Sequence, residues 1–389
     1  MLLFSEIPVS KQYSNKQPGR AVAATLDTAK QNLHIVWDSS SLIRLSAAGK
    51  AAFYPRMIQL KNCTLLLAFA SGGNVVTKKS YDNGRLWTKP LIAAEGKADI
   101  NEDTPELLEL NNGNILIFYN SRPQNRKNSG DQLKHAFDIR VKLSKDKGGS
   151  WESEQVLYEA GKSFKDGCWE PAALQLPDNT IQLFFSNEGI YTSSNEQNIS
   201  MLQSKNNGLT FSSIPQIISF RKGSRDGMPV PIWLTNTKQV VLSIEDPGVG
   251  NFKPYTIRSG KNGEWTKVIG SKDIDRQYAL HKRLNDSIYA GAPYLRQLSD
   301  GTTILSFQST EGRNINKDNN AVMRVAIGNK NAADFYENLP PFQVQEGYYA
   351  LWNSLCVLRG DTVAALTSAN AFSHSISEIW MIKGYVTTE

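Results

Sequence analysis

Apolar and polar residues alternate along most of the chain in one repeated pattern. An apolar run of β-strand length opens with a proline and has a leucine five residues after it; a polar turn and a second apolar run follow. Runs of this length, bounded by turn residues, favour β-hairpins. The copies begin at Tyr54, Thr104, Glu170, Met228 and Ala292, and a sixth begins at Trp352 with Asn353 in the proline position.

These six copies predict an all-β fold, a six-bladed β-propeller of four-stranded antiparallel blades. They recur at spacings of 50 to 66 residues, which leaves room for two further strands after each hairpin. A two-sheet β-sandwich is the alternative, but it has no reason to repeat one hairpin six times. We expect one propeller domain over residues 31–389 after a polar lead-in, residues 1–30. The last copy lacks a fourth strand, and we expect the segment from Ile35 to Leu45 to supply it.

A second repeat follows several of the hairpins. Ser80–Trp87 and Ser144–Trp151 have the pattern S-x-D-x-G-x-x-W, Ser204–Phe211 is a near match, and Ser259–Trp265 is a shorter copy. The Asp or Asn side chain can accept backbone N–H groups, the glycine supplies positive φ, and the aromatic residue packs back between strands. The motif therefore predicts a structural turn between the third and fourth strands of a blade.

Composition excludes several function classes. The net charge of +6 comes without a Lys/Arg block, so no nucleic-acid partner is expected. No run approaches the about 20 apolar residues that span a bilayer, so no membrane partner is expected either. Three separated cysteines and four scattered histidines indicate no disulfide framework and no metal site. We expect no cofactor and a monomer.

Candidate chemistry gathers at one end of the predicted propeller. That end collects the residues before each first strand and the loops that leave each second strand, among them Glu170, Glu188 and Glu245. Protonating a leaving oxygen and stabilising an oxocarbenium-like centre takes two positioned acids, so a glycosidase site is predicted. Each acid also has a plain structural interpretation. Glu245 could belong to a turn with Asp246, and Glu188 could be a solvated loop acid.

Further residues on this face are candidates for substrate binding. Arg56 and Arg225 could bind a hydroxyl-rich or anionic ligand, or could brace neighbouring loops. Trp169 and Tyr349 could stack on a sugar, although packing between blades explains them equally well. The acidic candidates for substrate contacts are Asp103 and Asp226, beside Glu188.

The order of motifs resembles the exo-1,5-α-L-arabinanase family of the sialidase superfamily, whose members are six-bladed propellers with Asp-box turns. The similarity covers roughly residues 50 to 310. It rests on Trp169-Glu170-Pro171, Ser186-Asn187-Glu188, Arg225-Asp226-Gly227-Met228, Ile244-Glu245 and Ala290-Gly291-Ala292-Pro293. The resemblance implies a carbohydrate substrate and a retaining exo-glycosidase, with Glu170 as acid/base and Glu245 as nucleophile. We also expect a secreted or periplasmic protein whose export signal is absent from the sequence as given, since the start MLLFSEIPVSKQ shows none.

Two other functions stay open at the level of sequence. An exo-α-sialidase needs a triad of arginines for the substrate carboxylate, whereas a non-catalytic glycan-binding propeller needs no close pair of acids. We expect Arg56 and Arg225 not to converge with a third arginine on one point. The carboxylates of Glu170, Glu188 and Glu245 should dominate the floor of the funnel instead.

Overall fold

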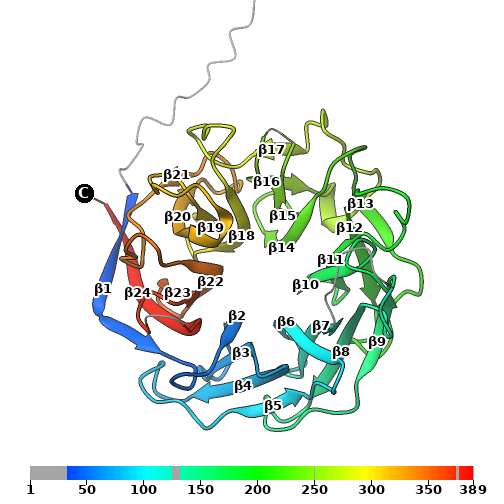
Figure 1. Cartoon of the computed structure of the whole chain (residues 1–389), viewed down its shortest axis with the longest axis horizontal. Helices are drawn as coiled ribbons and strands as arrows, with labels where there is room; N and C mark the ends of the chain where they lie inside the picture. Colours follow the sequence, from blue (N-terminus) through cyan, green and yellow to red (C-terminus); the bar gives the residue numbers. More distant parts are fainter. Residues whose placement is uncertain (1–32, 125–131, 249, 374–375, 389) are drawn as a thin grey trace, which may run out of the picture.

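The computed structural model describes residues 33–124, 132–248, 250–373 and 376–388, and these form six four-stranded antiparallel sheets around a central axis (Figure 1). The predicted six-bladed propeller is confirmed. The predicted lead-in, residues 1–30, lies outside the described residues. The described ranges contain two short 3-10 helices, η1 (Lys261–Gly263) and η2 (Asp318–Asn320), and no helix long and apolar enough to cross a bilayer.

Each of the first five blades is built from four consecutive strands, with the first strand nearest the axis. The first blade contains β2 (Ala52–Gln59), β3 (Leu65–Ser71), β4 (Asn74–Ser80) and β5 (Leu91–Ala94), and the second contains β6 (Ile100–Glu109), β7 (Ile115–Pro123), β8 (Asp138–Ser144) and β9 (Gln155–Glu159). The third contains β10 (Cys168–Gln175), β11 (Ile181–Asn187), β12 (Asn198–Ser204) and β13 (Gln216–Ser219). The fourth contains β14 (Gly227–Leu234), β15 (Gln239–Asp246), β16 (Lys253–Arg258) and β17 (Arg276–Tyr278), and the fifth contains β18 (Ala290–Gln297), β19 (Thr303–Ser309), β20 (Val322–Gly328) and β21 (Tyr336–Glu337).

The sixth blade joins the two ends of the described chain. Its inner strands are β22 (Ala350–Val357), β23 (Thr362–Ala369) and β24 (Glu378–Thr388), and its outermost strand is β1 (Leu33–Arg44), which pairs antiparallel with β24. Leu33 lies opposite Thr388 at one end of this ladder and Arg44 opposite Trp380 at the other. The N-terminal strand thereby covers an edge of the sixth sheet that would otherwise be open.

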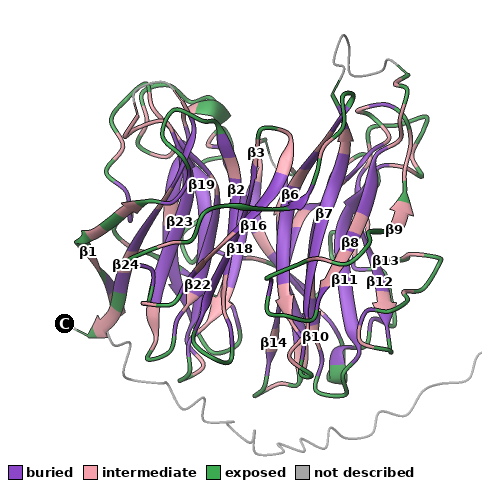
Figure 2. Cartoon of the chain, turned by 90° about the horizontal axis from the view of Figure 1, so that it is seen from below, coloured by how far each residue is buried: buried purple, intermediate pink, exposed green. Residues whose placement is uncertain are grey.

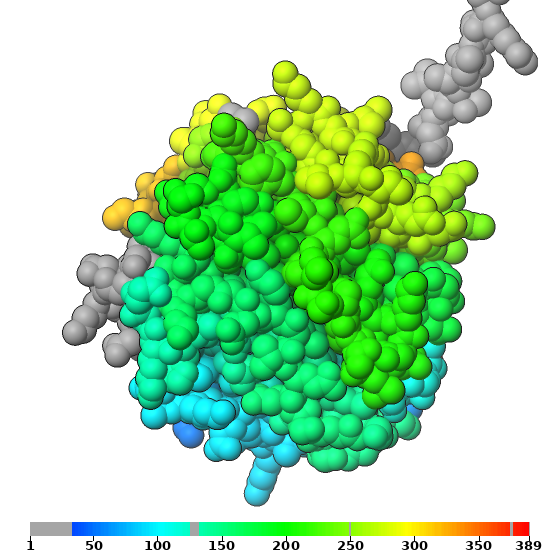
Figure 3. Space-filling view, turned by 90° about the vertical axis from the view of Figure 1, so that its right-hand side faces the viewer, coloured from blue at the N-terminus to red at the C-terminus, as the bar shows by residue number. Residues whose placement is uncertain are grey.

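The apolar core lies between neighbouring blades. Buried residues fill the middle of the sheets and exposed residues gather in the loops at both ends (Figure 2). One cluster contains Leu234 of the fourth blade and Leu295, Leu305 and Phe307 of the fifth. Seen from the side, the successive segments of the chain follow one another around the ring (Figure 3). This packing makes the inner strands a rigid wall on which side chains at the axis can be fixed.

The S-x-D-x-G-x-x-W turns lie between the third and fourth strands of their blades. In the turn after β8, Asp146 accepts hydrogen bonds from the backbone N–H groups of Gly149 and Ser150 and from two serine hydroxyls. These bonds hold the pKa of Asp146 well below its usual range. The turns close the ends of the blades away from the loops between second and third strands.

Candidate functional site

A ring of six β-bulges surrounds the axis at one end of the propeller. In every first strand the pairing with the second strand shifts by one residue, and a residue with positive φ occupies the bulge. Because all six share this backbone, the conformation belongs to the fold and is not specific to one side chain. The bulge residues are Tyr54 (φ 54°), Thr104 (45°), Glu170 (49°), Met228 (51°), Ala292 (48°) and Trp352 (50°).

A second ring of side chains caps these bulges across the blade junctions. At five of the six junctions, the bulge N–H donates to a side chain on the second strand of the preceding blade. The acceptors are Ser368 for Tyr54, Asn120 for Glu170, Ser186 for Met228, Glu245 for Ala292 and Gln308 for Trp352. At the remaining junction the corresponding residue is Ala70, which has no acceptor, and the N–H of Thr104 bonds to Asp103 instead at 2.7 Å.

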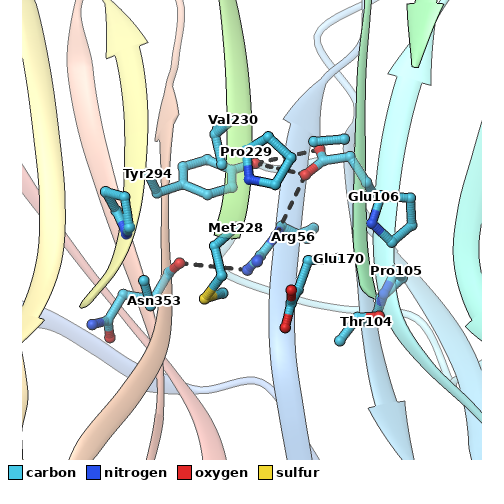
Figure 4. Close-up of a pocket in the computed structure, with 14 residues that line it drawn as sticks. Arg56, Thr104, Pro105, Glu106, Glu170, Met228, Pro229, Val230, Tyr294 and Asn353 are labelled. Atoms are coloured by element: carbon cyan, nitrogen blue, oxygen red, sulfur yellow. Dashed lines mark hydrogen bonds and ion pairs between the residues drawn. The ribbon is translucent and has the colours of Figure 1, made fainter. Parts of the chain in front are cut away.

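The two predicted catalytic residues come from these two rings. Glu170 is the bulge residue of the third blade, so its carboxyl group projects toward the axis, where it lines a small pocket with Thr104 and Met228 (Figure 4). Its N–H donates to Asn120 Oδ1 at 2.8 Å. The Ser186 hydroxyl donates to Glu170 Oε2 at 3.3 Å and accepts from the N–H of Met228. Both ends of Glu170 are therefore oriented by the neighbouring strands.

Glu245 occupies a capping position that other blades fill with a hydroxyl or an amide. Its Oε2 accepts the N–H of Ala292 at 2.8 Å, which leaves Oε1 for other contacts. Glycines flank it. A Cβ added to Gly291 would lie 2.8 Å from Oε2, and one added to Gly227 would lie 3.1 Å from Oε1. Side chains at either position would crowd the carboxyl group, so the glycines permit its close approach to the backbone.

The charge of Glu245 influences the ionisation of Glu170. Burial and the nearby charge of Glu245 raise the pKa of Glu170 to about 8, although Arg122 and Ser186 act in the opposite direction. Burial also raises the pKa of Glu245, while the Ala292 N–H and the charge of Arg225 lower it. The carboxyl group of Glu245 accepts a backbone N–H, which favours its ionised form, whereas that of Glu170 accepts a bond from the Ser186 hydroxyl. Of the two groups, Glu170 is therefore the better placed to carry a proton.

A chain of contacts between charged and aromatic side chains lies beside Glu170 and Glu245. Arg122 donates to Asp103 at 2.9 Å, and its guanidinium lies 5.1 Å from the ring centre of Trp169. The Trp169 indole N–H donates to Glu188 Oε2 at 2.9 Å, and Glu188 in turn pairs with Arg225. The structure thus brings four of the predicted binding residues, Asp103, Trp169, Glu188 and Arg225, into one connected group.

Arg56 lines the same pocket as Glu170, but its side chain is buried and bonded to the protein. Its side chain is buried below the bulge ring, where Nε lies 3.4 Å from Glu106 Oε2 and Nη1 donates to the carbonyl of Pro55 (Figure 4). The Tyr294 hydroxyl also contacts Glu106, and Arg296 reaches both. Arg56 is therefore part of a polar plug that fills the axis, because its donors are used within the protein. Arg296, which the sequence reasoning did not find, shares that plug.

Asp226 and Tyr349 also differ from the predicted picture. Asp226 is buried, with an exposed fraction of 1%, and bonds to Arg221 and Arg276. Its carboxylate is satisfied by the protein, which corrects its assignment as a substrate ligand. Tyr349 is half-buried against an apolar cluster that includes Tyr289 and Leu351. Packing between blades accounts for Tyr349 in this structure.

The arginines of the funnel have separate partners. Arg56 pairs with Glu106, Arg122 with Asp103, and Arg225 with Glu188. Each guanidinium faces a different carboxylate of the protein, so these three do not converge on one anion site. In the described residues, no group of three or more His, Cys, Asp or Glu side chains is arranged to hold a metal ion.

Sequence reasoning missed several residues beside the pair. Ser186 was quoted only as part of a motif, yet it orients Glu170. The Tyr289 hydroxyl accepts from Gln308 Nε2 at 2.7 Å, and burial, followed by the charge of Glu245, raises the pKa of Tyr289. The equivalent positions of Ser186 and Gln308 in their hairpins were the available signal. Nothing in the repeat marks Tyr289, which lies one residue before β18.

Comparison with known proteins identifies the fold. No protein-family model matches the sequence, and no curated protein does. A protein of unknown function from Dyadobacter fermentans is similar at a TM-score of 0.70 and 16% identity, over 91% of this chain and 100% of that one. The GH93 α-L-arabinofuranosidase of Fusarium graminearum, solved with arabinobiose, is similar at a TM-score of 0.62 and 16% identity, over 85% of this chain and 92% of that one. An α-L-arabinanase of Penicillium chrysogenum is similar at a TM-score of 0.63 and 16% identity, over 89% of this chain and 98% of that one.

Sialidases are similar as well, at lower values. The microbial sialidase Hadza Hz136 gives a TM-score of 0.58 and 12% identity, over 87% of this chain and 66% of that one. At these identities the comparisons establish the architecture, which arabinan-degrading and sialic-acid-cleaving enzymes share. The resemblance to the six-bladed propellers of the sialidase superfamily is thereby confirmed at the level of the fold.

Proposed function

We propose that this protein is a retaining, exo-acting glycoside hydrolase that releases sugars from the ends of arabinan-like or related polysaccharides. The observation that carries the proposal is the pair at the floor of the funnel. Burial and the charge of Glu245 raise the pKa of Glu170 to about 8. Burial raises the pKa of Glu245 as well, but the Ala292 N–H and the charge of Arg225 oppose that shift. This difference in environment suits Glu170 to the role of acid and Glu245 to that of nucleophile in a glycosidase.

In the proposed mechanism, Glu170 protonates the glycosidic oxygen as the bond to the anomeric carbon breaks. Glu245 attacks that carbon through Oε1, while Oε2 keeps its bond to Ala292, and a covalent glycosyl-enzyme forms. Glu170, now ionised, takes a proton from water, which attacks the same carbon and releases Glu245. A pKa near the working pH lets Glu170 act first as acid and then as base.

The small size of the pocket and the plug beneath it support the proposed exo action. Arg56, Glu106 and Tyr294 fill the axis below the bulge ring, so a polysaccharide cannot thread through the propeller. A chain end can enter the funnel from the open side only. The loops 188–197 and 310–321, together with the described parts of 124–137, rise around that side and would select the sugar.

The pairing of the arginines favours a neutral sugar over sialic acid. A sialidase would need guanidinium groups free to form bidentate bonds with the substrate carboxylate. Here Arg122 and Arg225 are engaged by Asp103 and Glu188. An anionic ligand would have to displace those carboxylates, whereas sugar hydroxyls can bond to the same groups without breaking the pairs.

The test is hydrolysis of linear arabinan, an aryl α-L-arabinofuranoside, galactan and a sialoside, with proton NMR of the first product. We expect arabinan-like substrates to be cleaved from their ends, with the anomeric configuration retained. Glu245→Gln should abolish turnover. Cleavage of the sialoside alone would replace the proposal with the sialidase reading, and release of the inverted sugar would remove Glu245 as nucleophile. A protein that binds these glycans and cleaves none would be a glycan-binding propeller.

A further inference from the structure

Two residues of the candidate site are each followed by a buried aspartate. Arg225 precedes Asp226 and Glu245 precedes Asp246, and the aspartates have exposed fractions of 1% and 2%. Successive side chains of a strand point to opposite faces, so Asp246 points away from the floor that Glu245 faces. The two aspartates therefore lie behind the site, on the side of the outer strands of the fourth blade.

Two arginines join these aspartates. Arg276, in β17, donates from Nη1 to Asp226 Oδ2 at 2.9 Å and from Nε to Asp246 Oδ2 at 3.1 Å. Arg221 donates from Nε to Asp226 Oδ1 at 3.0 Å, and its Nη2 lies 2.5 Å from Asp246 Oδ1. We call these four residues the buried quartet. It holds two positive and two negative charges, and Arg276 is itself buried.

The segment that carries Arg225 is also held from the inner side. Gln197 Nε2 donates to the carbonyl of Asp226 at 2.8 Å, and Gln197 Oε1 accepts from Arg225 Nη2 at 2.9 Å. Gly227, the next residue after Asp226, lies close to both Gln197 and Glu245. A Cβ at this position would lie 2.8 Å from Gln197 Nε2 and 3.1 Å from Glu245 Oε1. The connection between the third and fourth blades is thus clamped between Gln197 and the buried quartet.

Stability alone is a poor reason for such an arrangement. The desolvation of buried charges offsets most of their attraction, so replacing a buried ion cluster by apolar groups is often neutral or stabilising. What the fork of Arg276 does provide is a fixed distance between two chain segments, because its planar donors bind both carboxylates in one geometry. Those segments are the ones that present Arg225 and Glu245.

We propose that Arg276 is a positioning residue for the reaction: by holding Asp226 and Asp246 together, it fixes Arg225 and Glu245 relative to one another. The inference rests on the proposed function. Its consequence is electrostatic as well as geometric. Arg225 lowers the pKa of Glu245, whose other charged or titratable neighbours are Glu170 and Tyr289. If Arg225 moves away, Glu245 becomes harder to ionise.

The experiment compares Arg276→Lys and Arg276→Met with the wild type, and uses Arg140→Lys as a matched control. Arg140 also forks a buried aspartate, Asp138, but it lies in the second blade and does not contact the funnel pair. We expect Arg276→Lys to lower kcat roughly ten- to hundred-fold with little change in KM. The acid limb of the rate profile should move to higher pH. Arg140→Lys should lower only the melting temperature.

A second readout does not depend on activity. The Trp169 indole N–H bonds to Glu188, which pairs with Arg225, so its proton resonance, assigned with Trp169→Phe, reports the position of Arg225. We expect it to shift in Arg276→Lys and not in Arg140→Lys. An unchanged resonance and acid limb, with only a lower melting temperature, would make the quartet a structural brace and overturn the inference. If the wild type cleaves no sugar, the proposed function is wrong. The Trp169 resonance still tests whether Arg276 positions Arg225.

Discussion

Replacing Glu170 with glutamine should remove a catalytic acid and stabilise the protein at the same time. The carboxyl group has a pKa of about 8 in the folded protein, raised mainly by burial and then by the charge of Glu245. In the unfolded chain a glutamate has a pKa of about 4.3. The folded state therefore binds the proton more tightly, and its stability falls as the pH rises from about 4.3 through 8.

The size of the effect follows from that difference. At pH 7 the solution is about 2.7 pH units above the unfolded pKa and still below the folded one. Each unit corresponds to about 1.4 kcal/mol, so the limiting loss of stability is about 3.7 kcal/mol. Glu170 is only partly buried, and solvent screening reduces this to roughly 2 kcal/mol. At pH 5 the same reasoning leaves under about 1 kcal/mol. A neutral glutamine escapes the cost of ionisation at every pH.

Urea denaturation at pH 5 and pH 8 measures the difference between Glu170→Gln and the wild type. The variant should gain more stability at pH 8 than at pH 5. Its hydrolysis should fail with a poor leaving group and persist in part with a good one, because a good leaving group needs no proton. Glu102→Gln is the control. Glu102 is buried in the second blade with a pKa of about 7, so the variant should show a similar pH trend with activity kept.

Two results would refute the reasoning. If Glu170→Gln gains no more stability at pH 8 than at pH 5, Glu170 is ionised in the folded state and cannot be the proton donor at neutral pH. If the variant retains full activity on a substrate with a poor leaving group, Glu170 is outside the mechanism whatever its pKa. The Glu102→Gln control separates both outcomes from a general effect of removing a buried acid.

Three further predictions address other parts of the molecule. Arg56→Met should lower the free energy of unfolding by about 2–3 kcal/mol, because the buried Glu106 loses its nearer guanidinium and keeps only Arg296 and Tyr294, and adding Glu106→Gln should restore part of that loss in urea denaturation. Trp169→Phe removes the donor to Glu188 and should raise KM more than it lowers kcat; equal effects on both would contradict a binding role. Asp146→Ala removes the acceptor of its turn and should lower the melting temperature by a few degrees while the specific activity of the folded protein stays unchanged.

The architecture could be predicted because it is repeated. A proline near the start of the inner strand, replaced by Asn353 in the sixth copy, and a leucine five residues later mark a bulge and a hairpin in register, and six copies identify the ring. The same repeat located Glu170 correctly at the axis, since it occupies a position the fold itself directs inward. The topology of the repeat also placed Glu245 on this face, and the resemblance supplied its role as nucleophile, but its capping bond to Ala292 was not foreseen.

The ion-pair partners of long charged side chains could not be predicted from the sequence. Arg56 and Asp226 lie near the funnel in the chain, yet one bonds to Glu106 and the other to Arg276, 50 residues away in each case. Which carboxylate an arginine reaches depends on the packing of neighbouring blades and not on local pattern. Burial also determines whether a charged side chain is available to substrate, because a charge enclosed by protein must pair within the protein.

The rings of bulges and caps make the position of the site interchangeable around the axis. Each blade offers the same two backbone positions, and here an acid at the bulge of the third blade meets an acid at the cap of the fourth. One blade farther along, those positions are held by Met228 and Gln308. The two substitutions Met228→Glu and Gln308→Glu would therefore rebuild the same pair, rotated by one blade. On this scaffold the location of the reaction depends on which blades carry acids at these two positions. A duplicated blade would therefore already contain the backbone positions for a new active site before any acid occupies them.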